Sequence, residues 1–343
     1  MEMMIRPGFR TPDWRNMARI LEKGTPGRPT LFELFFDDDP IQSVTGRKIM
    51  PNDYKSRLAA TIRAHDLLGY DCVVIFASAF RYPSAEQRKG ETISLNDGFV
   101  ITDRNSFDKY PWPDNSGFDN TWLDAAAGFL PGGMRLLIWS DSGLLETVIR
   151  LTGYENLCYM IYDDEQLVSD IFERVGKGYL EYFRRCVEHP AVLALISSDD
   201  WGFKTQTLLP TAAMRKYLFP WQQEYVRLAH HFGKYAILHS CGYFDNILDD
   251  ILEAGFDARH SYEDAIVPVE DAYRRFGNSI AVLGGIDLDF LARSTPGAIG
   301  ARSKDMLLRT EKTGGYALGS GNSIPKYVPF ENYLAMTKPA LSQ

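Results

Sequence analysis

The chain alternates short apolar runs with longer segments whose apolar residues recur at helical spacing. The runs are rich in β-branched and aromatic side chains, which is typical of buried parallel strands. This pattern predicts eight strands, which begin at Thr30, Cys72, Arg135, Val192, Tyr235, Asp257, Ile280 and Tyr316. Strands that alternate with helices favour a closed (β/α)8 TIM barrel, an α/β fold formed by a single domain over residues 1–343. An open, doubly wound sheet is the alternative, but no G-x-G-x-x-G follows the first strand.

Helical patterns occupy the gaps between the predicted strands. They cover residues 52–68, 163–187, 211–232 and 244–254, with a bend at Pro220. Ser294 is the predicted cap of the next helix, and Pro329 opens the last one. Two regions do not fit the alternation. Residues 1–29 are predicted to form an N-terminal helical arm, and residues 77–133 an insertion over the barrel mouth that contributes to the substrate pocket.

Composition narrows the classes of function. The 343 residues are 45% hydrophobic, the net charge is −8 and the pI is about 5.4, which argues against a nucleic-acid surface. No apolar run reaches the roughly 20 residues of a membrane span, and the N-terminus lacks the apolar core of a signal peptide. Four widely spaced cysteines form no disulfide framework. We therefore expect a cytoplasmic protein with a small-molecule substrate and no nucleic-acid or membrane partner.

Polar residues cluster where the predicted strands end, and in a barrel these carboxyl ends form the active-site face. In chain order the candidates are Glu33, Asp37, Asp199, Asp200, Trp201, His239, Cys241, His260, Glu263, Asp287, and Ser320 and Asn322 within the GSGNS segment. Several of these residues are of types that act as metal ligands or as general acids and bases. Neither a G-K-[ST] phosphate loop nor a G-x-S-x-G nucleophile elbow is present.

The strongest signal is the sequence AILHSCG, residues 236–242. Residues two apart on a strand share a face, so the His239 imidazole and the Cys241 sulfur converge on one point. Imidazole and thiolate are a suitable pair of zinc ligands. The alternative is a buried cysteine beside a capped histidine.

Other candidates also have structural alternatives. Asp199 and Asp200 could cap the next segment, His260 could be a hydrogen-bonded core histidine, and Asp287 could cap a short helix at Leu288. Glu33 lies inside an apolar strand, where an unpaired carboxylate is costly, so its position favours a role in the site.

Five segments together resemble the uroporphyrinogen decarboxylase superfamily, which includes the decarboxylase and cobalamin-dependent methyltransferases. They are SSDDWGFKTQTLLP, HFGKYAILHSCG, ILEAGFDARHS, VLGGIDLDFLARSTP and YALGSGNSIPKYVPFENYLAM, from Ser197 onwards. Their order and spacing match from about Thr30 to the C-terminus. The resemblance implies a (β/α)8 barrel, in agreement with the pattern above.

The methyltransferase branch holds zinc with an H-x-C pair and a second, distant cysteine. His239 and Cys241 match the pair, but Ser320 stands where the distant cysteine would fall. A carboxylate from Glu33, Glu263 or Asp287 could replace it, and we predict Glu263 as the third ligand. We predict catalytic roles for Glu33, Asp200 and His260. The predicted substrate-binding residues are Trp201, Asp287, Ser320 and Asn322.

The predicted function is therefore methyl transfer between a small-molecule donor and a corrinoid or thiol, assisted by zinc. A separate corrinoid-binding protein is the expected partner, because the chain lacks a cobalamin-binding D-x-H-x-x-G motif; a homodimer is also allowed. A decarboxylase acting on a tetrapyrrole or other polyacid is the first alternative. The true decarboxylase has an arginine-rich R-Q-A-G-R segment where this chain reads GRPTLFELFFDDDP, which is acidic. A non-catalytic binding barrel is the second alternative, suggested by Ser320.

Overall fold

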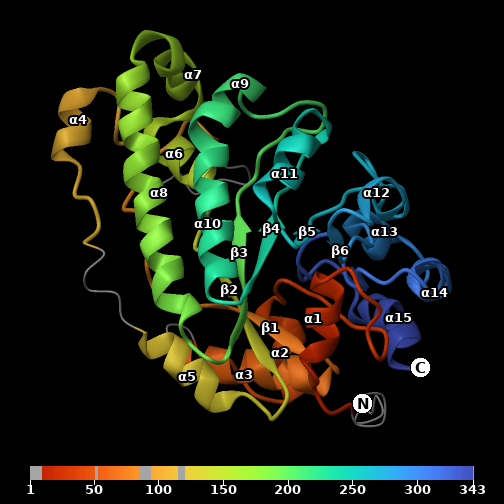
Figure 1. Ribbon diagram of the computed structural model, residues 1–343. Coiled ribbons are helices and arrows are strands. Elements are labelled where there is room, and N and C mark those ends of the chain that lie inside the picture. The colour runs from red at the N-terminus through yellow and green to blue at the C-terminus, as the bar shows by residue number, and fades with distance from the viewer. Residues whose placement is uncertain (1–9, 51–52, 85–93, 115–119, 343) are drawn as a thin grey trace.

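A computed structural model describes residues 10–50, 53–84, 94–114 and 120–342. Its centre is a curled, seven-stranded parallel sheet in which strand order follows chain order (Figure 1). The strands are β1 (Cys72–Phe76), β2 (Arg135–Trp139), β3 (Val192–Ser198), β4 (Tyr235–His239), β5 (Ala258–His260), β6 (Ala281–Leu283) and β7 (Tyr316–Ala317). Seven of the predicted strands are therefore confirmed, and the fold is of the TIM-barrel type.

The predicted strand from Thr30 is wrong as a regular strand. Leu31 forms an isolated parallel bridge to Leu318, and Phe36 forms another to Ile324. The segment therefore lies beside the chain that follows β7, in the place of an eighth strand, but with no continuous ladder in the described residues. One physical reason is Glu33, whose buried carboxyl group takes the backbone N–H of Ser320 as a partner.

Helices connect the strands and cover the sheet. Before β2 lie α1 (Arg15–Leu21), α2 (Asp38–Thr45), α3 (Tyr54–Leu67), α4 (Arg104–Lys109) and α5 (Thr121–Phe129). Between β2 and β4 lie α6 (Leu144–Thr152), α7 (Tyr154–Asp163), α8 (Glu165–Val187), α9 (Thr211–Ala213), the π-helix η2 (Met214–Leu218) and α10 (Phe219–His231). The remainder are η3 (Asp245–Ile247), α11 (Leu248–Ala254), α12 (Val269–Phe276), α13 (Leu288–Arg293), α14 (Pro296–Thr310) and α15 (Phe330–Leu341).

Most predicted helices are confirmed, with differences at their ends. The π-helix η2 ends at Leu218, two residues before Pro220, which has no N–H to continue the α-helical ladder at that point. The cap of α14 is Thr295, whose hydroxyl accepts from the backbone N–H of Ala298, and not the predicted Ser294. The predicted start at Asn52 lies outside the described residues.

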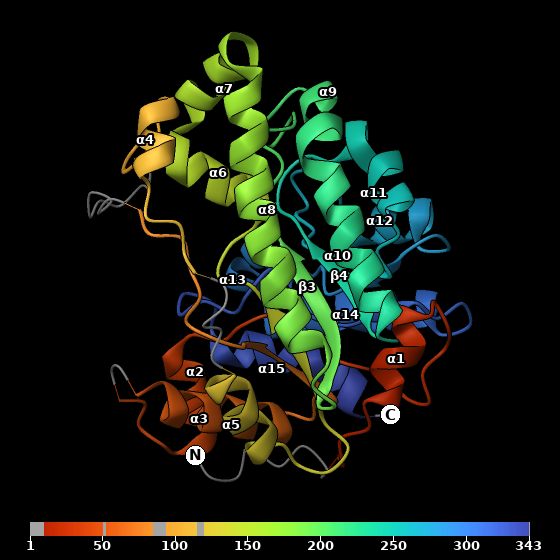
Figure 2. The same cartoon turned by 60° about the vertical axis from the view of Figure 1, so that its left-hand side comes forward.

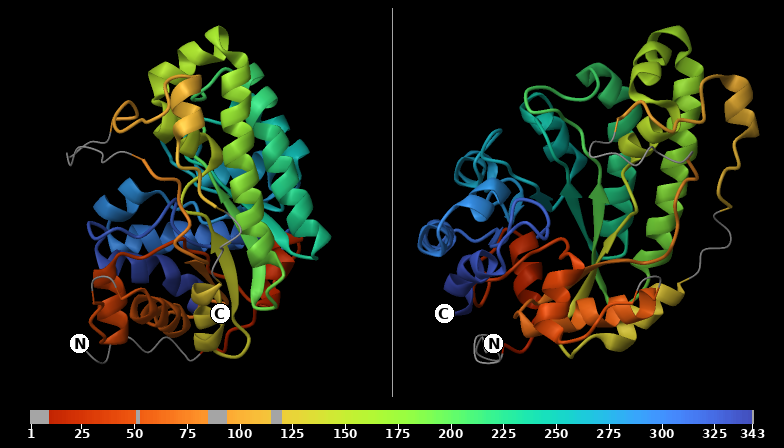
Figure 3. Two further views of the ribbon diagram at one scale, coloured as in Figure 1. Left: turned by 90° about the vertical axis from the view of Figure 1, so that its left-hand side faces the viewer. Right: turned by 180° about the vertical axis from the view of Figure 1, so that it is seen from behind.

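Two apolar layers lie on opposite faces of the curled sheet. The outer layer packs the helices against the strands, and α8 and α10 lie side by side over β3 and β4 (Figure 2). Figure 3 shows α12 to α15 gathered on the other side of the molecule. The inner layer combines inward-facing strand residues with Met17, Ile20 and Leu21 of α1. α1 therefore packs against the interior of the barrel.

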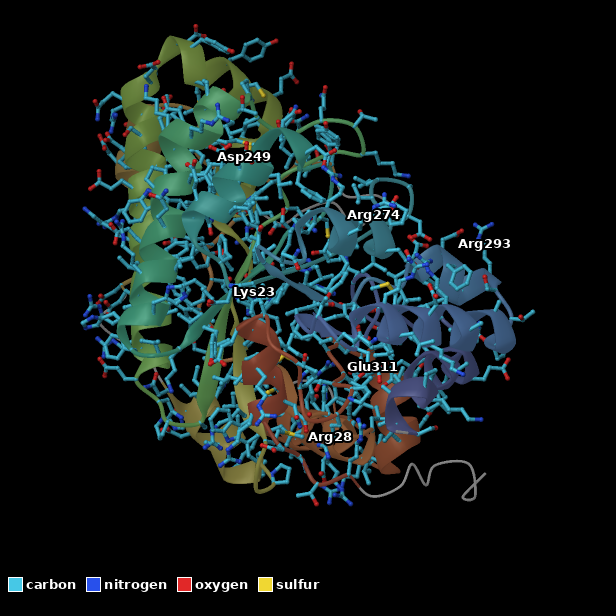
Figure 4. The ribbon with its side chains drawn as sticks, turned by 45° about the vertical axis from the view of Figure 1, so that its right-hand side comes forward. Lys23, Arg28, Asp249, Arg274, Arg293 and Glu311 are labelled. Carbon is cyan, nitrogen blue, oxygen red and sulfur yellow. The ribbon has the colours of Figure 1, made fainter. Side chains whose placement is uncertain are left out.

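The strands point toward the end of the molecule where α9 and α11 lie, whereas α1 lies toward the opposite end (Figure 1). In Figure 4, Asp249 on α11 marks the first end and Arg28, which follows α1, the second. Arg28 pairs with the buried Asp71 at 2.5 Å, and Asp71 also accepts from the backbone N–H of Asp13. These contacts fix the α1 region to the residue that precedes β1.

The long region from residue 77 to residue 133 contains α4 and α5. α4 lies near α7 at the end toward which the strands point, whereas α5 packs against α3 (Figure 1). Residues 85–93 and 115–119 of this predicted insertion, and residues 1–9 of the predicted arm, lie outside the described part of the chain. None of the described helices is both long and apolar enough to cross a bilayer.

Candidate metal centre

The carboxyl ends of β3 and β4 bring together three side chains of types that can coordinate a metal. The ligand atoms of Asp200, His239 and Cys241 lie within 4.8 Å of one another. Gly242 allows the close approach of the two loops: its φ is +87°, and a Cβ there would meet the carbonyl oxygen of Gly202 at 1.9 Å. The backbone N–H of Cys241 donates to Asp200 Oδ1 at 2.9 Å, which joins the loops directly.

Hydrogen bonds define the tautomer of His239. His260 Nε2 lies 3.2 Å from the carbonyl oxygen of Ser320, which can only accept, so Nε2 carries the hydrogen. His260 Nδ1 then accepts from His239 Nδ1, 2.8 Å away. Burial lowers the pKa of His260 to about 3 and that of His239 well below its usual value, so both rings are neutral. His239 Nε2 therefore carries no hydrogen and presents its lone pair.

That lone pair faces the sulfur of Cys241, with Nε2 and Sγ 3.6 Å apart. A tetrahedral zinc ion at its usual bond lengths separates nitrogen and sulfur ligands by about 3.6 Å. The sulfur also receives two donors, the Ser261 hydroxyl at 3.2 Å and the Asn322 amide at 3.3 Å. Burial, followed by the charge of Asp200, raises the pKa of the Cys241 thiol, so the metal-free sulfur keeps its proton. Nitrogen, sulfur and carboxylate donors thus fit a zinc-type ion that replaces this proton.

Ser261 is held in a left-handed conformation, with φ of +87°. This backbone geometry is costly for a residue other than glycine and is concentrated at functional sites. Arg259, two residues before Ser261, is fully buried. Its guanidinium donates to the carbonyl oxygens of Ser261 and Ser240, at 2.7 and 2.8 Å. It thereby ties together the two loops that carry Ser261 and Cys241.

Glu33 and Ser320 form a buried pair beside this centre. Ser320 Oγ lies 2.5 Å from Glu33 Oε1 and 3.0 Å from the carbonyl oxygen of Asn322. A hydroxyl has one hydrogen to donate, so both contacts are satisfied when Glu33 keeps its proton and donates to Ser320. Burial raises the pKa of Glu33 to about 8, which agrees with this arrangement. Glu33 is not part of the three-residue metal group.

The other predicted site residues have more ordinary positions. Glu263, the predicted third ligand, is not in the described metal group, where Asp200 stands instead. Both carboxylate oxygens of Asp287 accept backbone N–H groups, from Phe290 and Asp264, as expected of the capping alternative. Trp201 is fully buried and its ring packs edge-on against Phe219, so it has no exposed surface for a substrate. Asp37 accepts from the backbone N–H of Lys326.

The neighbouring aspartates divide two roles between them. Asp199 is fully buried and accepts from the backbone N–H groups of Leu145 and Glu146, so it caps α6. Asp200 belongs to the metal group. Both aspartates lie at the strand end, as predicted, but the local pattern does not show which of them is the cap. Arg259 and Ser261 were not predicted, although an arginine within a short buried strand is a visible signal.

A cavity of about 470 Å³ opens beside Asp200. Its lining includes Asp97, Asp141, Glu146, Arg150, Asp200 and Phe203. Burial, followed by the charges of Asp200 and Asp199, raises the pKa of Glu146 to about 8. Arg150 is the one cation among the described lining residues, and its Nη1 lies 3.7 Å from Asp141 Oδ2. The cavity therefore carries more negative than positive charge.

Comparisons with known proteins agree with this architecture. A model of the uroporphyrinogen decarboxylase (URO-D) family matches residues 145–340, which is more than half of the chain. A solved methyltransferase from Methanosarcina mazei matches with a TM-score of 0.74 at 15% identity, covering 95% of this chain and 97% of that one. At this identity the match shows a shared fold.

Weaker matches add nothing to the assignment. An endo-1,4-beta-xylanase from Caldicellulosiruptor owensensis has a TM-score of 0.41 at 10% identity, covering 76% of this chain and 80% of that one. A search of curated protein sequences found no significant match.

Proposed function

The chain belongs to the uroporphyrinogen decarboxylase family, and we propose that it is a metal-assisted methyltransferase. It would move a methyl group between a small-molecule donor and a corrinoid or thiol. One observation carries the proposal: Asp200, His239 and Cys241 lie within 4.8 Å of one another at the carboxyl edge of the sheet. A zinc ion bound there would supply Lewis-acid activation of the donor's heteroatom, or hold a thiol acceptor as a thiolate.

The residues of the chain prepare this centre in separate ways. His239 offers the Nε2 lone pair that its hydrogen bond to His260 leaves free. The Ser261 and Asn322 side chains both donate toward Cys241 Sγ, which stabilises negative charge on the sulfur. Asp200 joins the metal group to the wall of the neighbouring cavity, where the methyl donor would lie.

Charge argues against the decarboxylase alternative. A porphyrinogen with several carboxylates needs cationic partners, but the described cavity has Asp97, Asp141 and Asp200 against Arg150. Arg259 lies nearby but is fully buried, and its guanidinium donates to backbone carbonyls. The cavity therefore suits a neutral or cationic donor better than a polyanion. We also propose that the corrinoid arrives on a separate protein, since no cobalamin-binding motif is present in the sequence.

The test combines metal analysis with two activity assays. We expect the purified protein to bind about one zinc ion per chain, and Cys241→Ser to lose it. Cys158→Ser is the matched control, because Cys158 is also half-buried but lies on α7. Incubation with methyl donors and a free corrinoid should change the corrinoid absorption spectrum for the wild type and not for Cys241→Ser.

Two results would contradict the proposal. One is a reduced, folded wild-type protein that binds no zinc. The other is carbon dioxide release from uroporphyrinogen without a spectral change in any corrinoid assay.

A further inference from the structure

We propose that His260, Ser320 and Asn322 form a hydrogen-bonded relay that sets the metal affinity of His239 and Cys241 without contacting the metal. The inference rests on the proposed function, because it assigns a metal to the Asp200, His239 and Cys241 group. It adds positioning residues behind two ligands, and it gives Ser320 a role at the position where the family resemblance implies a cysteine.

The first branch of the relay ends at His239. Ser320 contributes its backbone carbonyl oxygen, which accepts from His260 Nε2 at 3.2 Å. His260 Nδ1 is thereby left to accept from His239 Nδ1 at 2.8 Å. The hydrogen of His239 is held on Nδ1, and Nε2 is presented to the metal group with its lone pair free. Outer hydrogen bonds of this type select the tautomer of a metal-binding histidine and fix its ring orientation.

Packing keeps the first branch in place. Gly284 has a φ of +68°, and a Cβ there would lie 2.2 Å from the Ser320 carbonyl oxygen and 3.0 Å from the His260 ring. Only a residue without a side chain leaves room for this hydrogen bond. Phe32 packs on the His260 ring, with centroids 5.0 Å apart.

The second branch ends at Cys241. Ser320 Oγ lies 3.0 Å from the carbonyl oxygen of Asn322, and Asn322 Nδ2 donates to Cys241 Sγ at 3.3 Å. Glu33 holds Ser320 from the other side, through both the backbone N–H and the hydroxyl. The contact between the Ser320 hydroxyl and the Asn322 carbonyl oxygen thus holds the turn in which the Asn322 amide donates to Cys241 Sγ.

Ser320 is therefore the junction of both branches. Its carbonyl oxygen accepts from His260, which in turn contacts His239, and its hydroxyl contacts Asn322, which in turn donates to Cys241. The residue is fully buried. A role in packing alone predicts that changes here lower stability and leave the metal affinity of the folded protein unchanged. The relay predicts separable effects on the nitrogen ligand and on the sulfur ligand.

The nitrogen branch is tested with His260→Phe and His260→Gln. Phenylalanine removes the acceptor, so we expect zinc affinity, measured by competition with a chromophoric chelator, to fall about 10- to 100-fold. Glutamine offers an oxygen to His239 and an amide hydrogen to Ser320, so it should restore most of the affinity. His65→Phe is the matched control, because His65 is also fully buried and hydrogen-bonded, but on α3; it should leave zinc affinity unchanged.

A direct readout needs no variant. ¹⁵N NMR of the metal-free wild type should show His239 protonated at Nδ1 and unprotonated at Nε2. A spectrum with the hydrogen on Nε2 overturns the nitrogen branch even if no variant folds.

The sulfur branch is tested with Asn322→Leu, which removes the donor to Cys241. Cobalt(II) added in place of zinc should bind, with a shifted sulfur-to-cobalt charge-transfer band and an affinity lowered by about tenfold. Asn332→Leu is the control, because Asn332 is a buried asparagine on α15 that donates to the Leu291 carbonyl. It should leave both quantities unchanged.

Failure of this inference is distinguishable from failure of the proposed function. If the wild type binds neither zinc nor cobalt, the proposed function is wrong. If the wild type binds both and His260→Phe and Asn322→Leu bind them equally well, the metal site stands and the relay is wrong.

Discussion

The two ends of the barrel interior are formed by the same short strands, but one end is apolar and the other is polar. Toward α1, the interior is apolar: Met17, Ile20 and Leu21 pack against inward-facing strand residues. At the carboxyl ends, the interior contains two neutral histidines, a protonated thiol and a buried glutamic acid. Apolar burial stabilises the first end, whereas each polar group at the second must find a partner. The difference separates the region that maintains the fold from the region that carries the candidate metal centre.

Cys241→Ser gives the largest expected effect at the polar end. Removing a thiolate ligand should weaken zinc binding by more than the about 10- to 100-fold attributed to an outer hydrogen-bond partner. Chelator competition measures this, with far-UV circular dichroism as the check that the protein is folded. A variant that keeps wild-type zinc affinity would remove Cys241 from the metal site.

Leu21→Ala is the corresponding change at the apolar end. Leu21 is fully buried on α1, so its truncation should lower the free energy of unfolding by about 2–5 kcal/mol. Urea denaturation measures this loss. Zinc affinity of the folded variant should equal that of the wild type, and a shift of tenfold or more would show that the two ends are coupled.

The pH dependence of stability distinguishes the ends further. The pKa of Glu33 is raised to about 8 in the folded protein, so the folded state holds a proton that the unfolded state has released above pH 4.5. Stability should therefore fall between pH 6.5 and 8, by about 2 kcal/mol from Glu33 alone at about 1.4 kcal/mol per pH unit. Glu146 and Asp199 act in the same direction, whereas the buried histidines change stability only below about pH 6.5.

Glu33→Gln should remove the Glu33 part of this slope. Glutamine reproduces the protonated acid, because it can accept from the Ser320 N–H and donate to the Ser320 hydroxyl. Thermal unfolding between pH 6.5 and 8 measures the slope. The zinc affinity of Glu33→Gln should be unchanged, and a large loss would instead make Glu33 a metal ligand.

Ser261→Gly gives the smallest expected effect, with opposite signs for stability and binding. Glycine relieves the left-handed backbone, which raises the free energy of unfolding by no more than about 1 kcal/mol. It also removes the hydroxyl that donates to Cys241 Sγ, which should weaken zinc binding by less than about tenfold. Equal stability and equal affinity in the two proteins would mean that Ser261 contributes neither strain nor a useful donor.

Local periodicity was sufficient to predict most of the fold. Seven strands follow from apolar runs, because a buried parallel strand is apolar on both faces. The segment at Thr30 has the same composition, yet it makes only isolated bridges, because the carboxyl group of Glu33 takes the backbone N–H of Ser320, 287 positions away. Such contacts between distant parts of the chain leave no trace in a local pattern.

The same distinction applies to the site. The convergence of His239 and Cys241 follows from strand alternation, and the side chains are adjacent as predicted. The third member of the group did not follow: Glu263 was predicted as the third ligand, whereas the side chain that lies with His239 and Cys241 is that of Asp200. Which of several strand-end carboxylates reaches the centre depends on loop geometry, here on the backbone contact between Gly242 and Gly202.

The order of the relay along the chain has a consequence for protein synthesis. Asp200, His239 and Cys241 leave the ribosome before the groups that set their chemical state: His260 follows His239 by 21 residues and Asn322 follows Cys241 by 81. A nascent chain thus carries the ligands while their outer partners are still missing. The α1 segment, by contrast, is synthesised before all seven strands, so it can pack against the barrel interior only after they have been made. On the proposed function, metal loading therefore follows translation past Asn322, because only then are both outer partners present.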